Sequence, residues 1–100
     1  MNSKLKNEST DFLFEAILTL ETKEDCYRFF EDLCTKPELN AMAQRIVVAK
    51  LLTNKTVYSE IVKRTGASTA TISRVNRSLN EDTDGYRLAF ERLVENGYDL

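Results

Sequence analysis

The chain contains 100 residues, of which 42% are hydrophobic and 30% are charged, and its formal net charge is −2 at pH 7. A chain of this length corresponds to one domain with a small core, which a partner chain can complete. The single proline, the three glycines and the many helix-forming residues favour an all-α fold. No apolar run is long enough to cross a membrane and the N-terminus lacks the apolar part of a signal peptide, so we expect a cytoplasmic protein without a membrane partner.

The chain is expected to begin with a flexible segment, residues 1–8, ahead of a single domain over residues 9–100. Ser9 or Thr10 is predicted to cap a first helix that stays apolar almost all the way round as far as Leu20. Because so short a chain cannot wrap such a helix, we infer a partner subunit. The alternative is that this helix lies at the centre of a compact monomer.

Two threonines mark the starts of the second and third helices. Thr22 and Thr35 both precede acidic residues in the pattern of a capping box, and the third helix, residues 36–53, is predicted to be the apolar spine of the fold. Cys26 and Cys34 lie about 12 Å apart along the second helix, too far for a disulfide, and are interpreted as small buried hydrophobes. Because the chain has no histidine, we expect no metal site.

The segment over about 57–79 predicts a helix-turn-helix, with Thr56 capping its first helix. Gly66 can adopt the left-handed backbone conformation that ends the first helix abruptly. Ser68 follows two residues later and can cap the second helix through its hydroxyl. At about 100° per residue, that second helix has an apolar face and a small polar and cationic face: Ile72, Val75 and Leu79 form the first, and Ala70, Ser73, Arg74 and Arg77 the second.

Positive charge is concentrated around this segment. Residues 41–80 hold seven cations and one acid, a net charge of +6, so the rest of the chain sums to −8. A basic segment inside an acidic chain is typical of phosphate binding and predicts double-stranded DNA as the partner, against the alternative of two helices joined only for packing. The candidate DNA contacts that follow from exposure and charge are Lys63, Ser68, Thr69, Ala70, Thr71, Arg74 and Arg77.

The C-terminal part predicts an acidic linker and one more helix. The linker, residues 80–84, should point away from DNA because its charge repels phosphate. Thr83 or Asp84 is predicted to cap a helix over residues 86–95, which Gly97 closes. The sequence therefore predicts six helices, of which the fourth and fifth form the helix-turn-helix.

The chain resembles the Trp repressor superfamily in Leu51-Leu52, Glu60, residues 65–67, residues 70–74 and Ser78-Leu79. Within that superfamily it resembles the Trp-repressor-related proteins of the YerC/YecD type in two stretches, GASTATISRV at 66–75 and DGYRL at 84–88. The likeness covers about residues 10–96. It implies a six-helix Trp-repressor-like fold, assembled as an intertwined homodimer whose first, second, third and last helices interlock. It also implies a sequence-specific DNA-binding transcriptional regulator, a repressor, with base or phosphate contacts at Thr69, Ala70, Thr71, Ser59 and Ser73.

The resemblance fails at the tryptophan site of that family. Arg74 matches an arginine that holds the ligand carboxylate, but Val75 stands where a glycine leaves room for the indole ring. The second carboxylate-binding arginine falls at Gln44, and Arg45 is about 100° away round the helix. We therefore predict that tryptophan is not a corepressor. The candidate ligand pocket of Arg45, Arg74 and Val75 is either filled by side chains or open to another ligand.

A different class of function is a helix-turn-helix module that binds a protein partner without specific DNA binding, using the acidic remainder of the chain. An enzyme is not expected. The sequence has no histidine, no paired carboxylates at a plausible cleft, no cysteine beside a base and no glycine-rich phosphate loop. No cofactor is expected for the same reasons.

Overall fold

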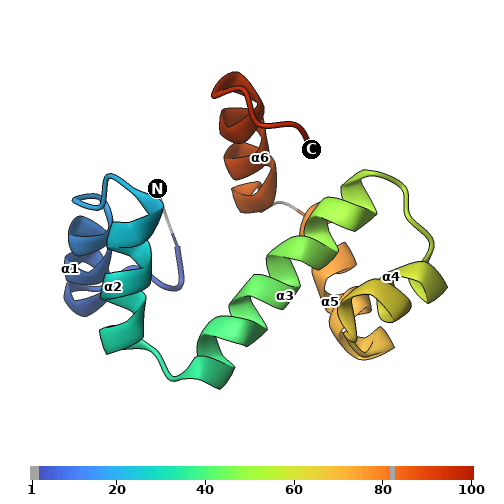
Figure 1. Cartoon of the computed structure of the whole chain (residues 1–100), viewed down its shortest axis with the longest axis horizontal. Coiled ribbons are helices and arrows are strands. Elements are labelled where there is room, and N and C mark those ends of the chain that lie inside the picture. Colours follow the sequence, from blue (N-terminus) through green and yellow to red (C-terminus); the bar gives the residue numbers. More distant parts are fainter. Residues whose placement is uncertain (1–2, 82) are drawn as a thin grey trace. The chain divides into compact units, whose positions relative to one another are not determined.

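The computed structural model describes residues 3–81 and 83–100, and within them it has six α-helices and no strand (Figure 1). The helices are α1 Glu8–Ile17, α2 Lys23–Leu33, α3 Lys36–Thr53, α4 Tyr58–Thr65, α5 Thr69–Asn80 and α6 Gly85–Glu95. The predicted all-α class and six-helix order are therefore confirmed.

The chain forms two compact units, Met1–Leu39 and Asn40–Leu100, each described here by itself. The single domain over 9–100 stays a prediction. Residues 1 and 2 of the predicted flexible segment, and Asp82 of the predicted acidic linker, lie outside the described residues.

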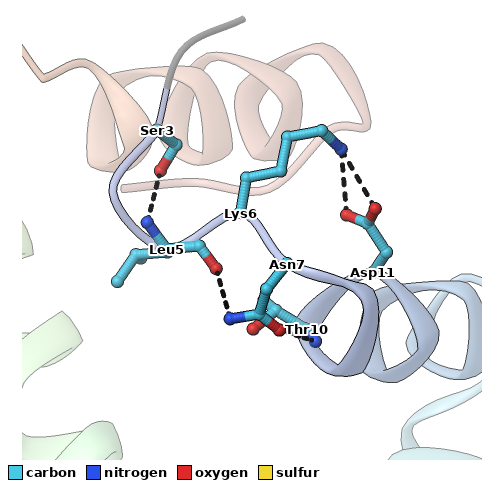
Figure 2. A network of polar contacts seen from close by, with 6 residues as sticks. All are labelled: Ser3, Leu5, Lys6, Asn7, Thr10 and Asp11. Carbon is cyan, nitrogen blue, oxygen red and sulfur yellow. Dashed lines mark hydrogen bonds and ion pairs between the residues drawn. The ribbon is translucent and has the colours of Figure 1, made fainter.

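The start of α1 differs from the sequence prediction. Asn7, not Ser9 or Thr10, is the N-cap, and its Oδ1 accepts the backbone N–H of Thr10 at 2.8 Å (Figure 2). Lys6 adds an ion pair to Asp11 at 3.0 Å. Asn7 can act as the cap because its backbone is extended, at φ −160° and ψ 172°, as the N-cap position requires.

The end of α1 also differs, because the helix stops at Ile17 and does not reach Leu20. The Thr19 hydroxyl donates to the Ala16 carbonyl at 2.6 Å. Such a local side-chain bond gives the backbone an alternative to another helical turn.

Capping boxes start α2 and α3, as predicted. Thr22 Oγ1 accepts the Asp25 backbone N–H at 3.0 Å, and the Asp25 carboxylate accepts the Glu21 N–H at 3.1 Å. Thr35 and Glu38 exchange the reciprocal pair, at 3.3 and 2.8 Å. These backbone N–H donors lower the pKa of both carboxyls below their ordinary values, because they stabilise the ionised form.

The first unit contains no buried residue within α1 or α2. Phe12 on α1 and Leu18 directly after it are 78% and 79% exposed. On α2, Phe29 and Phe30 meet edge to face at 5.3 Å and are only half-buried. The interpretation of Cys26 as buried is wrong, since it is exposed, and Cys34 is half-buried. Both thiols are free, and α2, which carries Cys26 and ends at Cys34, has no buried residue.

The second unit contains the core. Its buried residues come from α3, α4, α5, α6 and the turn before α5: Val48, Ala49, Leu51, Ile61, Ala67, Ile72, Val75 and Phe90. The helix-turn-helix is thus packed on the C-terminal half of α3 through a shared apolar cluster. This packing, and not local propensity alone, fixes the short α4 and α5.

The same arrangement of backbone bonds ends α3 and α6. At the end of α3, Lys55 has a positive φ of 66° and bonds to the Leu52 carbonyl, while the Thr56 N–H reaches the Leu51 carbonyl, both at 3.0 Å. Thr56 thus helps to end α3. The prediction that Thr56 caps α4 is wrong. Val57 takes the cap position without a side-chain bond.

At the end of α6, Gly97 has φ 87° and confirms the predicted closure. Its N–H bonds to the Val94 carbonyl, and the Tyr98 N–H bonds to the Leu93 carbonyl, both at 2.9 Å. At the start of α6, Asp84 holds the predicted cap position but makes no side-chain cap bond.

Candidate nucleic-acid interface

The turn between α4 and α5 is fixed by hydrogen bonds around Gly66. Its backbone has φ 71°, as predicted, and its N–H bonds to the Val62 carbonyl at 2.8 Å. Thr65 Oγ1 donates to the Ile61 carbonyl at 2.7 Å and accepts the N–H of Ala67 at 3.1 Å. Ala67 itself is buried, so the turn is held from the side of the core as well. The second helix therefore leaves the turn in a defined direction.

Ser68 starts α5 as predicted, through a double contact with Thr71. Ser68 Oγ accepts the Thr71 backbone N–H at 3.1 Å, and its hydroxyl donates to Thr71 Oγ1 at 3.0 Å. The Ser68 hydroxyl is thus used within the protein, and Thr71 is half-buried. Both residues set the first turn of α5, while Thr69 and Ala70 between them are exposed.

The two faces of α5 separate as the sequence indicates. Ile72 is 0% and Val75 2% exposed, and both belong to the core cluster. The outer face is exposed at Thr69, Ala70, Ser73, Arg74 and Arg77. On α4, Ser59 and Lys63 are exposed too. The structure thus brings the candidate contacts to the surface of one helical pair, and their contacts with DNA stay a prediction.

No ion pair in the described part of the chain neutralises the cations around this pair. Across residues 3–81 and 83–100, the only ion pair within 4.0 Å is Lys6 with Asp11, which lies outside the basic segment. Lys55, Lys63 and Arg64 are exposed, and Arg45 and Lys50 are half-buried. Unneutralised surface cations in one segment give the field that attracts a polyanion.

The three residues of the candidate ligand pocket lie in different environments. The methyl groups of Val75 lie in the core, as its helical phase predicts, whereas Arg45 is half-buried and Arg74 is exposed. None of the three lines the hollow found in this unit.

That hollow, of about 1030 Å³, is bounded by α3, α5 and α6. Its apolar lining includes Ile46, Leu79, Ala89 and Val94. Within the described residues no cluster of metal-ligand side chains occurs, and no helix is long and apolar enough to span a membrane.

Gln44 is the site residue whose role sequence reasoning missed. Its side-chain amide donates to the main-chain carbonyl of Thr65, the last residue of α4, at 3.1 Å. In the sequence Gln44 stood out only as a departure from a family pattern. Its spacing from Val48 and Leu51, four and seven residues on, places it on the inward face of α3 and could have indicated an internal contact.

Comparison with known proteins agrees with this geometry. The family model described as "Trp repressor protein" matches residues 8–94. The chain is 50% identical to the uncharacterized protein YerC of Bacillus subtilis (strain 168) over 92 residues, which cover 92% of this chain and 88% of YerC.

Two solved structures have the same fold. A TrpR-like protein from Eubacterium eligens ATCC 27750 superposes with a TM-score of 0.87 at 53% identity, covering 92% of this chain and 95% of that one. A candidate Trp repressor from Staphylococcus aureus superposes with a TM-score of 0.85 at 49% identity, covering 90% of each chain. The helix order, the helix-turn-helix and these matches together show that the chain belongs to the Trp repressor family.

Proposed function

We propose that the protein is a cytoplasmic, sequence-specific DNA-binding transcriptional regulator that represses as a homodimer and does not require tryptophan. The observation that carries the proposal is the two-faced α5. It is anchored in the core by Ile72 and Val75 and offers small polar and cationic side chains outward, within a segment of net charge +6.

The exposed side chains divide into two roles. Lys63, near the end of α4, is suited to phosphate contact, which supplies sequence-independent and salt-dependent affinity. Thr69 and Ala70, exposed in the first turn of α5, are at the positions where recognition helices meet base edges. Arg74 and Arg77, about one and two turns further along, can reach guanine or phosphate.

Exposed apolar side chains support the homodimer. Phe12 on α1 and Leu18 directly after it are more than three-quarters exposed, and the first unit has no core of its own within its described helices. The hollow bounded by α3, α5 and α6 offers a second copy apolar side chains to bury. Burying such side chains is the main favourable term in association.

Tryptophan independence rests on two side chains. Val75 occupies core space that the family ligand would need, and the Gln44 amide is already bonded to Thr65. Titration calorimetry of the purified protein should therefore detect no tryptophan binding. Binding in the micromolar range would contradict this part of the proposal.

The deciding experiment selects DNA from a random pool with purified protein, without ligand, near physiological salt. The proposal predicts an enriched palindrome with half-sites about 34 Å apart, because a two-fold dimer places two reading helices in successive major grooves. Weak binding without enrichment would favour a protein-interaction module, in which the acidic remainder of the chain docks a basic partner.

Alanine variants test the roles on the selected site. Lys63→Ala should weaken binding on every sequence and reduce the slope of log affinity against log salt by about 1. Thr69→Ala should instead relax preference at particular bases. Lys23→Ala removes an exposed lysine at the start of α2, outside the basic segment. It should change neither the affinity and its salt dependence nor the base preference. Equal losses for Lys63→Ala and Thr69→Ala on specific and random DNA would contradict the division of roles.

A further inference from the structure

A side-chain hydrogen bond links α3 to the end of α4. The Gln44 Nε2 lies 3.1 Å from the carbonyl oxygen of Thr65, across 21 residues of sequence. This carbonyl ends α4 immediately before Gly66, where the chain reverses into the reading helix. Gln44 therefore acts at the hinge of the helix-turn-helix and not at its periphery.

The Thr65 carbonyl needs a donor. The last four carbonyls of a helix have no partner within it and carry the partial negative charge of the helix C-terminus. Gly66 bonds to the Val62 carbonyl and leaves that of Thr65 to Gln44. The half-buried amide thus satisfies a main-chain group at the point where the direction of α5 is decided.

We propose that Gln44 is a positioning residue that fixes the reading helix relative to α3 without a ligand. Apolar packing alone permits small sliding of α4 and α5 on α3, because it is non-directional, whereas a hydrogen bond to a fixed carbonyl defines one position. The inference deepens the proposed function and rests on it for its effect on DNA. If α3 belongs to the dimer body, the Gln44 bond sets the distance between the two reading helices.

The measurement that tests the positioning role is the affinity for DNA sites whose half-sites are moved apart or together. A role in stability alone would not change how strongly the protein distinguishes these spacings. Moving one half-site by one base pair displaces it by about 3.4 Å and rotates it by about 35°. The wild-type protein should lose about tenfold or more in affinity on such a site. Gln44→Met keeps the length of the side chain but removes the donor. Its affinity for the altered spacing should be only about threefold lower than its affinity for the selected spacing. On the selected spacing it should bind about two- to tenfold more weakly than wild type.

Two further variants separate the donor from shape and from stability. Gln44→Glu keeps the shape but presents only acceptor oxygens when ionised, so it should tolerate altered spacing at least as well as Gln44→Met. Asn54→Ala removes another long-range side-chain bond, the exposed one from the Asn54 amide to the Leu100 main-chain oxygen at 3.0 Å, just beyond the C-terminal end of α3. It should keep the wild-type discrimination. The inference would be overturned if Gln44→Met discriminated between the two spacings as strongly as wild type does. It would also be overturned if Asn54→Ala lost as much of this discrimination as Gln44→Met does.

Hydrogen exchange distinguishes this inference from the proposed function. In Gln44→Met the amides of Gly66 and Ala67 should exchange about threefold or more faster than in wild type, and in Asn54→Ala they should not. If wild-type protein selects no DNA site but this difference appears, the proposed function fails and the positioning role stands. If exchange at the turn is unchanged in Gln44→Met, the positioning role fails whatever the DNA result.

Discussion

Val75→Ala tests the packing on which the tryptophan prediction depends. Val75 is 2% exposed within the core cluster, so the substitution removes two buried methyl groups. At about 0.8 kcal/mol each, their transfer to water costs roughly 1.6 kcal/mol, and the cavity left behind brings the loss to about 2–3 kcal/mol. A helix gains roughly 0.5 kcal/mol from alanine over valine, which offsets part of the loss.

Val62→Ala is the matched control, because it makes the same change within α4 at a side chain that is 37% exposed. The helix-propensity gain is common to both variants and cancels in their difference. We expect Val75→Ala to be less stable than Val62→Ala by about 1.5 kcal/mol. Urea unfolding measures this at one fixed protein concentration, since association of subunits would couple to unfolding. A difference below about 0.5 kcal/mol would refute the close packing of Val75.

Three further predictions concern backbone and capping. Gly66→Ala should destabilise by about 1 kcal/mol in urea unfolding, because φ is 71° and no atom lies within 4 Å of an added Cβ, leaving only backbone strain. Lys55→Gly should raise stability by about 0.5–1 kcal/mol, since a lysine holds φ 66° there, and a loss would contradict this. Because the Thr35 N–H lowers the pKa of Glu38 below 4.5, the capping box should stabilise α3 at neutral pH and weaken as pH falls through that lowered value. The advantage of wild type over Glu38→Ala in unfolding midpoint should therefore shrink between pH 7 and 3, and a pH-independent difference would argue against it.

Local chemistry made much of the candidate site predictable. Gly66 and Ser68 act through bonds to residues within four positions, and a sequence displays such neighbours directly. The inward phase of Ile72 and Val75 follows from helical periodicity, which needs no knowledge of the rest of the fold.

Two of the wrong predictions, both of helix caps, arose where local solutions competed. Thr56 has the side chain of an N-cap, yet its backbone N–H is used to end α3, and Val57 takes the cap position. Asn7 replaces Ser9 or Thr10 because three capping residue types within four positions offer alternative starts, and the extended backbone at Asn7 selects one. Each outcome depends on backbone angles that residue types do not specify.

The sequence by itself determined the all-α class, the helix-turn-helix, the two faces of α5 and the basic segment, because all four depend on spacing and charge along the chain. Only the tertiary structure decided that Gln44 bonds to the Thr65 carbonyl and that Val75 joins Val48 and Ile61 in one cluster. These contacts join residues far apart in sequence, and their partners are chosen by how α3 packs against α4 and α5. The way the reading helix is held is therefore a property of the folded chain.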